Sequence, residues 1–433
     1  MRKSTLLVFS VFFQLTFLQA QSGSWSVKTL GSGVCRDVIF SDTSYGWAVA
    51  DSGKIMRSTN GGVTWTNQTS PTIRNLYSVF FLDRNTGLAA GAAGTFLKTT
   101  NGGVSWVSHP TSDKVPWKRI YFDDVQNGWL LSDTVTSKIH HSTDGGLTWS
   151  QVGPQLFPGF QVADMSFSSG TNGWVAGDSI LLHSSDGVNW TNMNNGVFTY
   201  LFGVSFPSDT TGYLLHVYSN GSTDVSILYT TTDAGQNWNT LPVTFTGMIL
   251  SSVTFLSPNE GWIAGDSLHP SSYFLAGGVI YHTTDAGVHW LRELFLDSVT
   301  INRIHFTDQT HGWFAGYSYT HGTNTQTIGK YSGTVTGVHD GGSSLPLYFA
   351  LDQNYPNPFN PSTIIRFSLS KEEHVRLEVL DLEGKVVRVL VDGVRPPGEY
   401  SETFSGGTFS SGIYFYRLTD GSSSVTKKMI FLR

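Results

Sequence analysis

The chain has 433 residues, a net charge of −6 and only 13% charged residues, against roughly 25% in an average soluble domain. This length exceeds one ordinary core and predicts several folded units. The charges form no basic stripe, which excludes a nucleic-acid-binding surface. The single cysteine, Cys35, excludes an internal disulfide and is interpreted as a core or loop residue.

The first twenty residues have the layout of a secretory signal. Arg2 and Lys3 precede an apolar run from Leu6 to Leu18, which is too short to span a bilayer. We expect cleavage after Ala20, and no later stretch is long and apolar enough for a membrane helix. The sequence therefore predicts a signal peptide over residues 1–20 and a mature chain without a transmembrane segment.

A repeat fills residues 21–332. In each copy a Phe is followed seven residues later by a large apolar residue, which a Gly directly precedes. Successive glycines, from Gly46 to Gly312, lie 39 to 51 residues apart, the period of a four-stranded propeller blade. The sequence predicts an all-β fold that begins with a seven-bladed β-propeller. The seven pairs are Phe40/Trp47, Phe81/Leu88, Phe122/Trp129, Phe167/Trp174, Phe206/Tyr213, Phe255/Trp262 and Phe306/Trp313.

Each repeat is expected to hold four strands. The first ends at the Phe, and the Gly before the second is expected to adopt a conformation that other residues avoid. The third leads into a turn motif, here called the box, whose Trp opens the fourth. The boxes are STNGGVTW (58–65), TTNGGVSW (99–106), STDGGLTW (142–149), SSDGVNW (184–190), TTDAGQNW (231–238) and TTDAGVHW (283–290).

These boxes resemble the Asp-box, or bacterial neuraminidase repeat, Ser/Thr-x-Asp-x-Gly-x-Thr-Trp. In such a turn Asn or Asp accepts backbone N–H bonds, Gly allows a positive φ, and Trp packs between sheets. A turn that recurs in nearly every blade cannot mark one unique site. We therefore predict a structural role for the boxes, without calcium binding.

The seventh repeat has no box, and its missing strand is found at the other end of the chain. From each box Trp to the next Phe the sequence counts 16 to 18 residues, and Trp25 precedes Phe40 by 15. The strand around Trp25 is therefore predicted to complete the seventh blade. Such closure removes the exposed edges of an open ring.

The tail begins with a small, polar stretch that is expected to be a flexible linker over residues 333–346. Alternating segments such as HVRLEVLD and GIYFYRL then predict a small immunoglobulin-like β-sandwich over residues 347–433. This segment closely resembles the type A sorting domain of the Bacteroidota type IX secretion system. The residues that carry the resemblance are Tyr355–Pro361, the Asp381–Lys385 turn, Ser411–Phe415 and Lys427-Lys428.

The resemblance of the tail implies a partner and a destination. The partner is the type IX secretion machinery, which would recognise residues 347–433. The destination is the medium or the outer cell surface of a Gram-negative, Bacteroidota-like bacterium, usually with removal of the domain.

The propeller also resembles the photosystem II stability and assembly-factor propellers, over about residues 24–332. The shared residues build the fold, so the resemblance implies no role in photosynthesis. Propellers of similar appearance include sialidases and xyloglucan-active hydrolases, so a catalytic role depends on the individual residues present and not on the fold. None of the seven propeller arginines stands in the Arg-Ile-Pro context of a sialidase: Arg36, Arg57, Arg74, Arg84, Arg119, Arg292 and Arg303.

Other glycosidases need two carboxylates across a cleft. Glu260 and Glu293 are the only glutamates of the propeller, and four aspartates recur at nearly one position after the second strand, which favours a turn role: Asp51, Asp133, Asp178 and Asp266. Three histidines occupy a slot that basic residues fill in other blades, which indicates a repeat feature: His141, His183 and His282. The sequence predicts no catalytic residue, no metal ligand and no cofactor.

The turn between the second and third strands varies most in length. It lengthens in the last three repeats, where the loops 216–226, 267–279 and 317–327 rise from adjacent blades on one face. We predict a binding or scaffold module for an extracellular glycan or protein, with a glycan-active hydrolase as the alternative. The candidate ligand-binding side chains, suited to stacking on sugars or holding a peptide, are His216, Tyr218, Asp224, His269, Tyr273, Phe274, Tyr317, Tyr319 and His321.

Overall fold

The computed structural model divides the chain into two compact units, Met1–Thr336 and Gly337–Arg433. The predicted signal peptide, residues 1–20, and the predicted linker apart from Gly333 lie outside the described residues. The first unit is described over residues 24–132, 138–153, 162–194, 196, 198–268, 275–319 and 322–333. The second is described over residues 350–351, 354, 357–369, 372–396, 398–407, 409–420 and 424–432.

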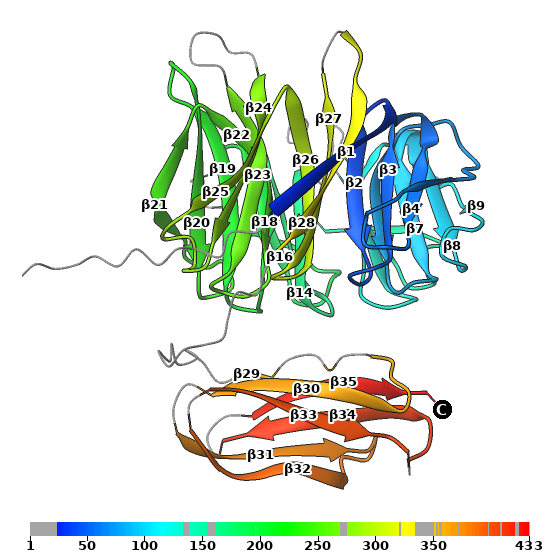
Figure 1. The fold of residues 1–433 in the computed structure, drawn as a ribbon, viewed down its shortest axis with the longest axis vertical. Coiled ribbons are helices and arrows are strands. Elements are labelled where there is room, and N and C mark those ends of the chain that lie inside the picture. Colours follow the sequence, from blue (N-terminus) through cyan, green and yellow to red (C-terminus); the bar gives the residue numbers. More distant parts are fainter. Residues whose placement is uncertain are drawn as a thin grey trace, which may run out of the picture. The chain divides into compact units, whose positions relative to one another are not determined.

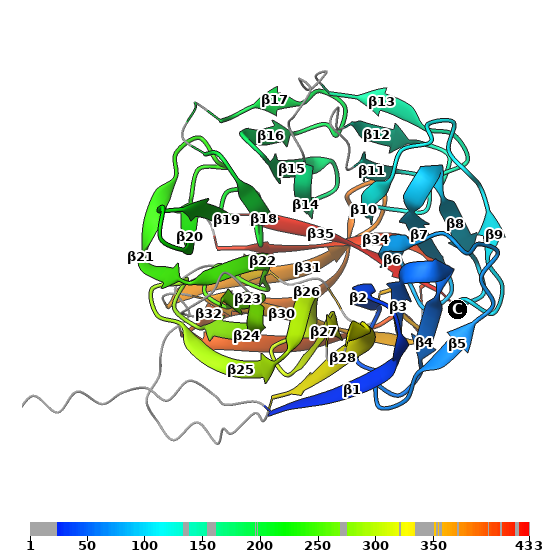
Figure 2. The ribbon, with the colours of Figure 1, turned by 90° about the horizontal axis from the view of Figure 1, so that it is seen from above.

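The first unit is a seven-bladed β-propeller, as the repeat predicts (Figures 1 and 2). Each blade is a four-stranded antiparallel sheet, and the first strand of each blade lies nearest the central axis. Blades 1 to 3 comprise β2 (Cys35–Phe40), β3 (Gly46–Ala50), β4 (Ile55–Ser58) and β5 (Thr66–Gln68); β6 (Leu76–Phe81), β7 (Gly87–Gly91), β8 (Phe96–Thr99) and β9 (Val107–Ser108); and β10 (Trp117–Phe122), β11 (Gly128–Ser132), β12 (Ile139–Ser142) and β13 (Ser150–Val152). Short 3-10 turns, η1 (Asp51–Gly53) and η2 (Ala92–Gly94), join the second and third strands of blades 1 and 2.

Blades 4 to 6 repeat this order, and blade 7 borrows one strand from the N-terminus. Blades 4 to 6 comprise β14 (Val162–Ser169), β15 (Asn172–Gly177), β16 (Ile180–Ser184) and β17 (Thr191–Asn192); β18 (Leu201–Ser205), β19 (Gly212–Ser219), β20 (Asp224–Thr231) and β21 (Asn239–Thr246); and β22 (Met248–Phe255), β23 (Gly261–Leu268), β24 (Leu275–Thr283) and β25 (Leu291–Asp297). Blade 7 comprises β26 (Val299–Asp308), β27 (His311–Ser318), β28 (Thr325–Ser332) and β1 (Ser24–Ser32).

The Phe at the end of each first strand lies between two other side chains. Phe40 stacks face to face on Trp313 of the preceding blade, with 3.5 Å between ring centroids, and meets the box Trp65 of its own blade edge-on at 5.7 Å. The same pair of contacts recurs around the ring, except that blade 2 supplies Leu88 in place of an aromatic ring. These sandwiched rings hold neighbouring blades together, because each ring buries a large apolar area between two blades and its edge-on pair with the box Trp adds to that burial.

The invariant Gly of the repeat is needed for space. A Cβ atom built on Gly46 would lie 2.4 Å from the ring of Phe40, and the other six glycines would place theirs 2.2–2.5 Å from the corresponding Phe. None of the seven has a positive φ. The expectation of an unusual backbone conformation is therefore wrong, and close approach of the ring is the reason for glycine.

The N-terminal strand closes the ring, which confirms the interpretation of Trp25. β1 pairs antiparallel with β28, with Ser24 opposite Ser332 and Trp25 opposite Tyr331. Trp25 meets Phe306 edge-on, the contact that a box Trp makes in every other blade. Blade 7 thus has the complete four-strand sheet although its sequence is split between the two ends of the propeller.

The boxes form turns held by their own side chains. The Ser58 hydroxyl accepts a hydrogen bond from the backbone N–H of Gly62 at 2.8 Å, and the Asn60 amide oxygen accepts one from Thr64 N–H at 2.8 Å. The boxes from blades 2, 3, 5 and 6 repeat both bonds. Within the described residues no three His, Cys, Asp or Glu side chains gather as metal ligands would.

The second unit is a small β-sandwich. One sheet contains β29 (Ala350–Leu351), β30 (Ser362–Leu369) and β33 (Gly398–Ser405), and the other contains β32 (Val386–Arg395), β31 (Glu373–Leu380), β34 (Gly412–Thr419) and β35 (Ser424–Phe431) in that order. Both contribute to one buried core that includes Phe367, Leu377 and Tyr416. No helix in the described part of the chain has the length and apolar character that a membrane span needs.

Candidate ligand-binding site

Every first strand of the propeller carries a β-bulge four residues before its Phe. In blade 1 the pairing of β2 with β3 shifts between Cys35 and Asp37, so Arg36 is the extra residue. A bulge breaks the alternation of a strand and re-aims the side chain of the extra residue. The extra residues in blades 2 to 7 are Tyr77, Lys118, Ala163, Phe202, Ser251 and Asn302.

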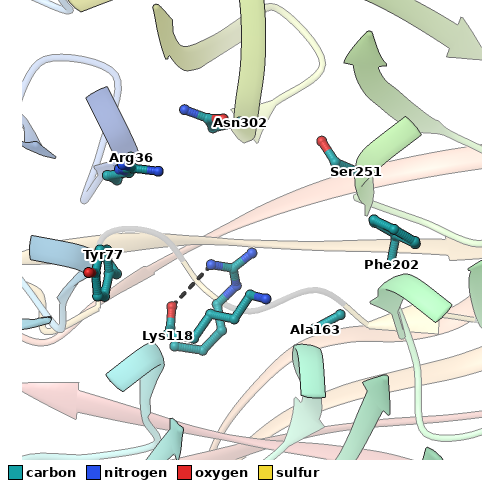
Figure 3. A pocket seen from close by; sticks show the side chains of 8 residues that line it. Arg36, Tyr77, Lys118, Ala163, Phe202, Ser251 and Asn302 are labelled. Carbon is teal, nitrogen blue, oxygen red and sulfur yellow. Dashed lines mark hydrogen bonds between the residues drawn. The ribbon is translucent and has the colours of Figure 1, made fainter. Parts of the chain in front are cut away.

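The seven bulged residues line one pocket on the propeller axis, together with Arg119 (Figure 3). Its volume is about 450 Å³, within the range of small-ligand sites. The bulges lie near the start of the first strands. The blade-to-blade connections and the turns between second and third strands lie at this same end, so the pocket belongs to the face on which the longer loops of the last three blades are placed.

The lining of the pocket is divided by charge. Blades 1 to 3 supply Arg36, Tyr77, Lys118 and Arg119, whereas blades 4 to 7 supply only uncharged lining residues: Ala163, Phe202, Ser251 and Asn302. We call these groups the cationic half and the neutral half of the pocket. Figure 3 shows Arg36, Tyr77 and Lys118 around one part of the pocket and Phe202, Ser251 and Asn302 around the rest.

Neighbouring groups fix several of these side chains in place. Arg36 pairs with Asp51 through Nε and Nη2, at 2.9 and 3.1 Å, and its guanidinium lies 5.9 Å from the centre of the Tyr77 ring. The Asn302 amide donates to the Cys35 carbonyl at 2.8 Å, and the Ser251 hydroxyl donates to the Ile301 carbonyl at 3.3 Å. Much of the pocket is therefore preorganised before any ligand arrives.

A buried ionic layer lies one residue further along the first strands. Arg303 of blade 7 donates from Nη1 to both Asp164 oxygens of blade 4, at 3.0 and 2.9 Å, and Arg119 of blade 3 donates to Asp164 at 2.9 Å. Asp37 accepts from the Ser78 hydroxyl and from Val79 N–H, each at 3.0 Å. This network crosses the axis, and the Asp164 side chain is only 1% exposed. We infer that it forms the floor of the pocket.

The two carboxyl groups of this floor differ in their ionisation. Burial opposes the charge on Asp164, but the charges of Arg303 and Arg119 outweigh it and hold the pKa of Asp164 below its ordinary value. Burial raises the pKa of Asp37 in spite of the same two arginines. At neutral pH Asp164 is thus ionised, and Asp37 is the more easily protonated of the two groups.

The loop side chains predicted as ligand contacts lie in several environments. His269, Tyr273, Phe274 and His321 lie outside the described residues. His216 is buried inside blade 5, where its Nε2 lies 3.1 Å from the Thr199 hydroxyl. The Tyr319 hydroxyl donates to the Leu275 carbonyl at 3.0 Å, and its ring contacts that of Tyr317. Tyr218 and Asp224 lie at the ends of β19 and β20, and none of these five lines the central pocket.

The histidine slot has a structural role, as the repeat indicates. His141, His183 and His282 lie on the third strands of three different blades, where each stacks on the second-strand Trp of its own blade. They are consequently held apart from one another.

The recurrent aspartates also serve local contacts. The Asp51 carboxylate pairs with Arg36, and the Asp266 carboxylate accepts from Ile301 N–H at 3.3 Å. The backbone of Asp178 forms an isolated β-bridge with that of Tyr200. Burial raises the pKa of Asp266 to about 7. Asp133 lies outside the described residues.

The pocket residues were missed by the sequence reasoning, although a signal for them exists. In an alignment of the seven blades, the positions five and two residues before the Phe are apolar throughout or nearly so, as at Cys35 and Val38. The position four residues before it holds Arg, Tyr, Lys, Ala, Phe, Ser and Asn. A column of varied, largely polar residues within a buried strand indicates side chains that share a site rather than a core.

These features define an exported β-propeller protein with a separate sorting domain, because residues 353–432 match the family described as the secretion system C-terminal sorting domain. Residues 18–119 and 117–250, together more than half of the chain, match the family described as photosynthesis system II assembly factor YCF48. The chain belongs to this family. The sorting domain indicates export by type IX secretion, to the medium or to the cell surface.

Known proteins resemble the propeller over different lengths. The photosystem II assembly lipoprotein Ycf48 of Synechococcus sp. (strain CC9902) is 28% identical over 148 residues, which are 30% of this chain and 41% of the relative. The chain thus spans less than half the length of that relative. A structure of YCF48 bound to D1 peptide has a TM-score of 0.55 at 19% identity, covering 72% of this chain and 97% of that chain. The GH74 xyloglucanase from Xanthomonas campestris has a TM-score of 0.52 at 16% identity, covering 69% and 54%. The two structures establish a shared propeller fold.

Proposed function

We propose that this protein is an exported binding module whose ligand docks in the central pocket. The observation that carries the proposal is the set of seven bulges, each of which directs one side chain from its blade into the same space. The packing of the blades does not by itself require the bulged residue to differ from one blade to the next. The module would act in the medium or on the outer surface of a Gram-negative, Bacteroidota-like cell, after removal of the sorting domain.

A peptide segment is the ligand class that we favour. A solved structure shows YCF48 bound to D1 peptide, and that protein shares the fold of this propeller. The pocket offers aromatic surface from Tyr77 and Phe202 together with polar groups from Asn302 and Ser251, a mixture that suits a peptide. The three longer loops of blades 5 to 7 would form a rim on the same face.

Glycan hydrolysis is the alternative, and the pocket chemistry favours binding over it. Hydrolysis by the usual route needs two carboxyl groups about 5–10 Å apart on either side of the bond that breaks. The described lining of the pocket contains no carboxyl group. Asp164 and Asp37 lie in the floor, where arginines and backbone N–H groups already occupy their oxygens.

The test compares the full chain with a Tyr77→Ala/Phe202→Ala variant in capture from a peptide library and on a glycan array. We expect peptides to be retained by the parent and retention to fall at least about tenfold in the variant, since a buried aromatic contact is worth more than 1 kcal/mol. Tyr200→Ala, which removes an exposed aromatic ring outside the pocket, is the matched control. Unchanged capture by the double variant would contradict the pocket as the site, and release of sugars from the array would favour the hydrolase.

A second variant tests the rim. Shortening the loops 216–226, 267–279 and 317–327 to the length found in blade 1 is expected to preserve folding and to weaken capture, because such loops lengthen or shorten at small cost. Circular dichroism checks the fold. Full capture by the shortened protein would show that the pocket works without the rim.

A further inference from the structure

We propose that the group that enters the central pocket is an acidic side chain of the peptide, a Glu or Asp carboxylate, with its neighbouring apolar residue against the neutral half. This inference rests on the proposed binding function and names the chemistry of the ligand. It follows from the separation of charge in the lining, from the ionic floor and from the position of the pocket on the axis.

The cationic half is arranged to receive an anion. Arg36 engages Asp51 through Nε and Nη2, so its Nη1 takes no part in that pair. Lys118 comes from the bulge of blade 3, and Arg119 beside it bonds the floor through Nε. Three cations from blades 1 and 3 thus line one space. Charge-assisted hydrogen bonds from Arg and Lys to a carboxylate are roughly twice as strong as neutral ones.

The floor supports this preference. Asp164 is bonded by two arginines, so its negative charge is directed to them and not to the pocket. Asp37 accepts hydrogen bonds from Ser78 and Val79 inside the layer. An entering carboxylate would therefore meet cations and no carboxyl group in the lining, in a partly enclosed site where Coulomb attraction is stronger than in water.

The position of the pocket limits the shape of what can enter. First strands surround it on every side, and the layer of Asp37, Asp164 and Arg303 lies beneath it. A group on a flexible stem can enter such a pocket end-on, as a Glu or Asp side chain does. In an acidic polysaccharide the carboxylate is attached directly to the sugar ring of the polymer, so the polymer itself would have to enter. The geometry therefore favours a peptide.

The neutral half suits the residue beside the acid. Phe202 and Ala163 present apolar surface, and Asn302 donates from Nδ2 to Cys35, which leaves its amide oxygen as an acceptor for a peptide N–H. A neighbouring apolar side chain would bury area against Phe202. A ligand that offered a carboxylate without a neighbouring apolar side chain would contact only the cationic half of the pocket.

The experiment uses the full chain and pools of N-acetylated, C-amidated pentapeptides whose central residue is Glu, Asp, Gln or Asn and whose flanks are random. Blocked ends leave the central residue as the only fixed charge. We expect the Glu and Asp pools to be retained at least about tenfold more than the Gln and Asn pools, with retention falling as salt is raised. Lys118→Met should lower acidic-pool retention about tenfold. Arg74→Met, which removes an exposed cation on the blade 1 to blade 2 connection, should change it less than about twofold.

Other outcomes overturn the inference in different ways. Equal retention of the Gln and Glu pools, lost in Phe202→Ala, would show a binding pocket without a preference for acids, so the proposed function would stand and this inference would fall. Retention of oligogalacturonate instead of peptides, lost in Lys118→Met, would identify an acidic glycan as the partner. If wild-type protein retained none of these probes, both the inference and the proposed function would be rejected.

Discussion

Trp25, in the first strand of the chain, lies edge-on against Phe306 of the last blade, with ring centroids 6.0 Å apart and planes at 84°. In the other six blades the box Trp meets the Phe at 5.7–6.1 Å and 86–90°. The contact is thus the same whether it forms within a blade or between the two ends of the propeller. Trp25 also packs against Phe314 and Tyr331.

Trp25→Ala should therefore destabilise the propeller by about 2–4 kcal/mol, because it removes a large side chain from a packed cluster and loosens the strand that closes the ring. Guanidinium-induced unfolding of the full chain, followed by tryptophan fluorescence, measures the loss. Val27→Ala, on the same strand but exposed, should cost less than about 0.5 kcal/mol. Equal stability of the two variants would show that β1 is not needed for closure.

Gly87→Ala tests the spatial reason for the repeated glycine. The new Cβ would lie 2.2 Å from the Phe81 ring, so the ring must move from its stack on Trp47, at a cost of about 1–3 kcal/mol. The double variant Gly87→Ala/Phe81→Leu should recover part of this loss, since the smaller side chain leaves room. Gly393→Ala lies in the separate sorting domain, where nothing is within 4 Å of the new Cβ, and should leave the stability of the propeller unchanged. A loss in Gly87→Ala that Phe81→Leu leaves unchanged would contradict the steric explanation.

Asp164→Ala is expected to be among the most damaging substitutions in the propeller. It leaves Arg119 and Arg303 without their common partner in a buried layer, and breaking a buried ion pair from one side costs about 3–5 kcal/mol. Arg84→Ala removes the partner of Asp42 in a pair whose Arg is 55% exposed, and should cost less than about 1 kcal/mol. Denaturant unfolding of both variants decides the point. Comparable losses of unfolding free energy in the two variants would contradict a large contribution of the pocket floor to stability.

The pH dependence of stability in blade 6 should follow His282, which lies on β24. Burial alone would lower the pKa of His282, but hydrogen bonds and charge from Glu260 and Glu293 raise it above its ordinary value. Nδ1 lies 3.0 Å from Glu293, which also accepts from the Trp25 indole at 3.4 Å. A His with a raised folded-state pKa contributes stability that is complete below about pH 6.5 and is lost as the pH rises through the folded-state pKa.

The difference in unfolding free energy between the parent chain and His282→Gln should accordingly be largest at acidic pH and shrink as the pH rises. Urea unfolding at several pH values between 5 and 9 measures it. His289→Gln, at an exposed position of a box, serves as the control with little change. A difference that grows with pH would require a neutral His282 in the folded state.

The architecture was predictable because each blade needs the same few contacts. The Phe–Gly–Trp spacing reflects a Phe ring stacked between blades and a Gly that makes room for it. The length of the repeat and the number of blades can therefore be counted from the sequence. The place of Trp25 was predictable for the same reason, since its distance to Phe40 matches the repeat. The physical role of the Gly was not predictable, because glycine is required both where space is short and where φ is positive. The residue type alone does not distinguish these two needs.

The pocket could not be found in the same way. A strand is expected to alternate its side chains, and the bulge at Arg36 and its six counterparts breaks this alternation. Only the bulge in blade 5 has a Gly beside it, Gly203, and none has a Pro. The sequence reasoning therefore placed the ligand on the long loops, where insertions were visible. Those loops differ in length and sequence from blade to blade. Their side chains, such as Tyr218 and Tyr319, stay predicted ligand contacts.

Ser24 and Ser332 are paired across β1 and β28, so the polypeptide enters and leaves the propeller at one spot on its rim. That spot belongs to the face of the boxes, whereas the pocket opens on the other face, near the start of the first strands. A segment that continues beyond Ser332 would thus leave the propeller from the face of the boxes. The attachment point and the mouth of the pocket therefore lie on opposite faces of the propeller.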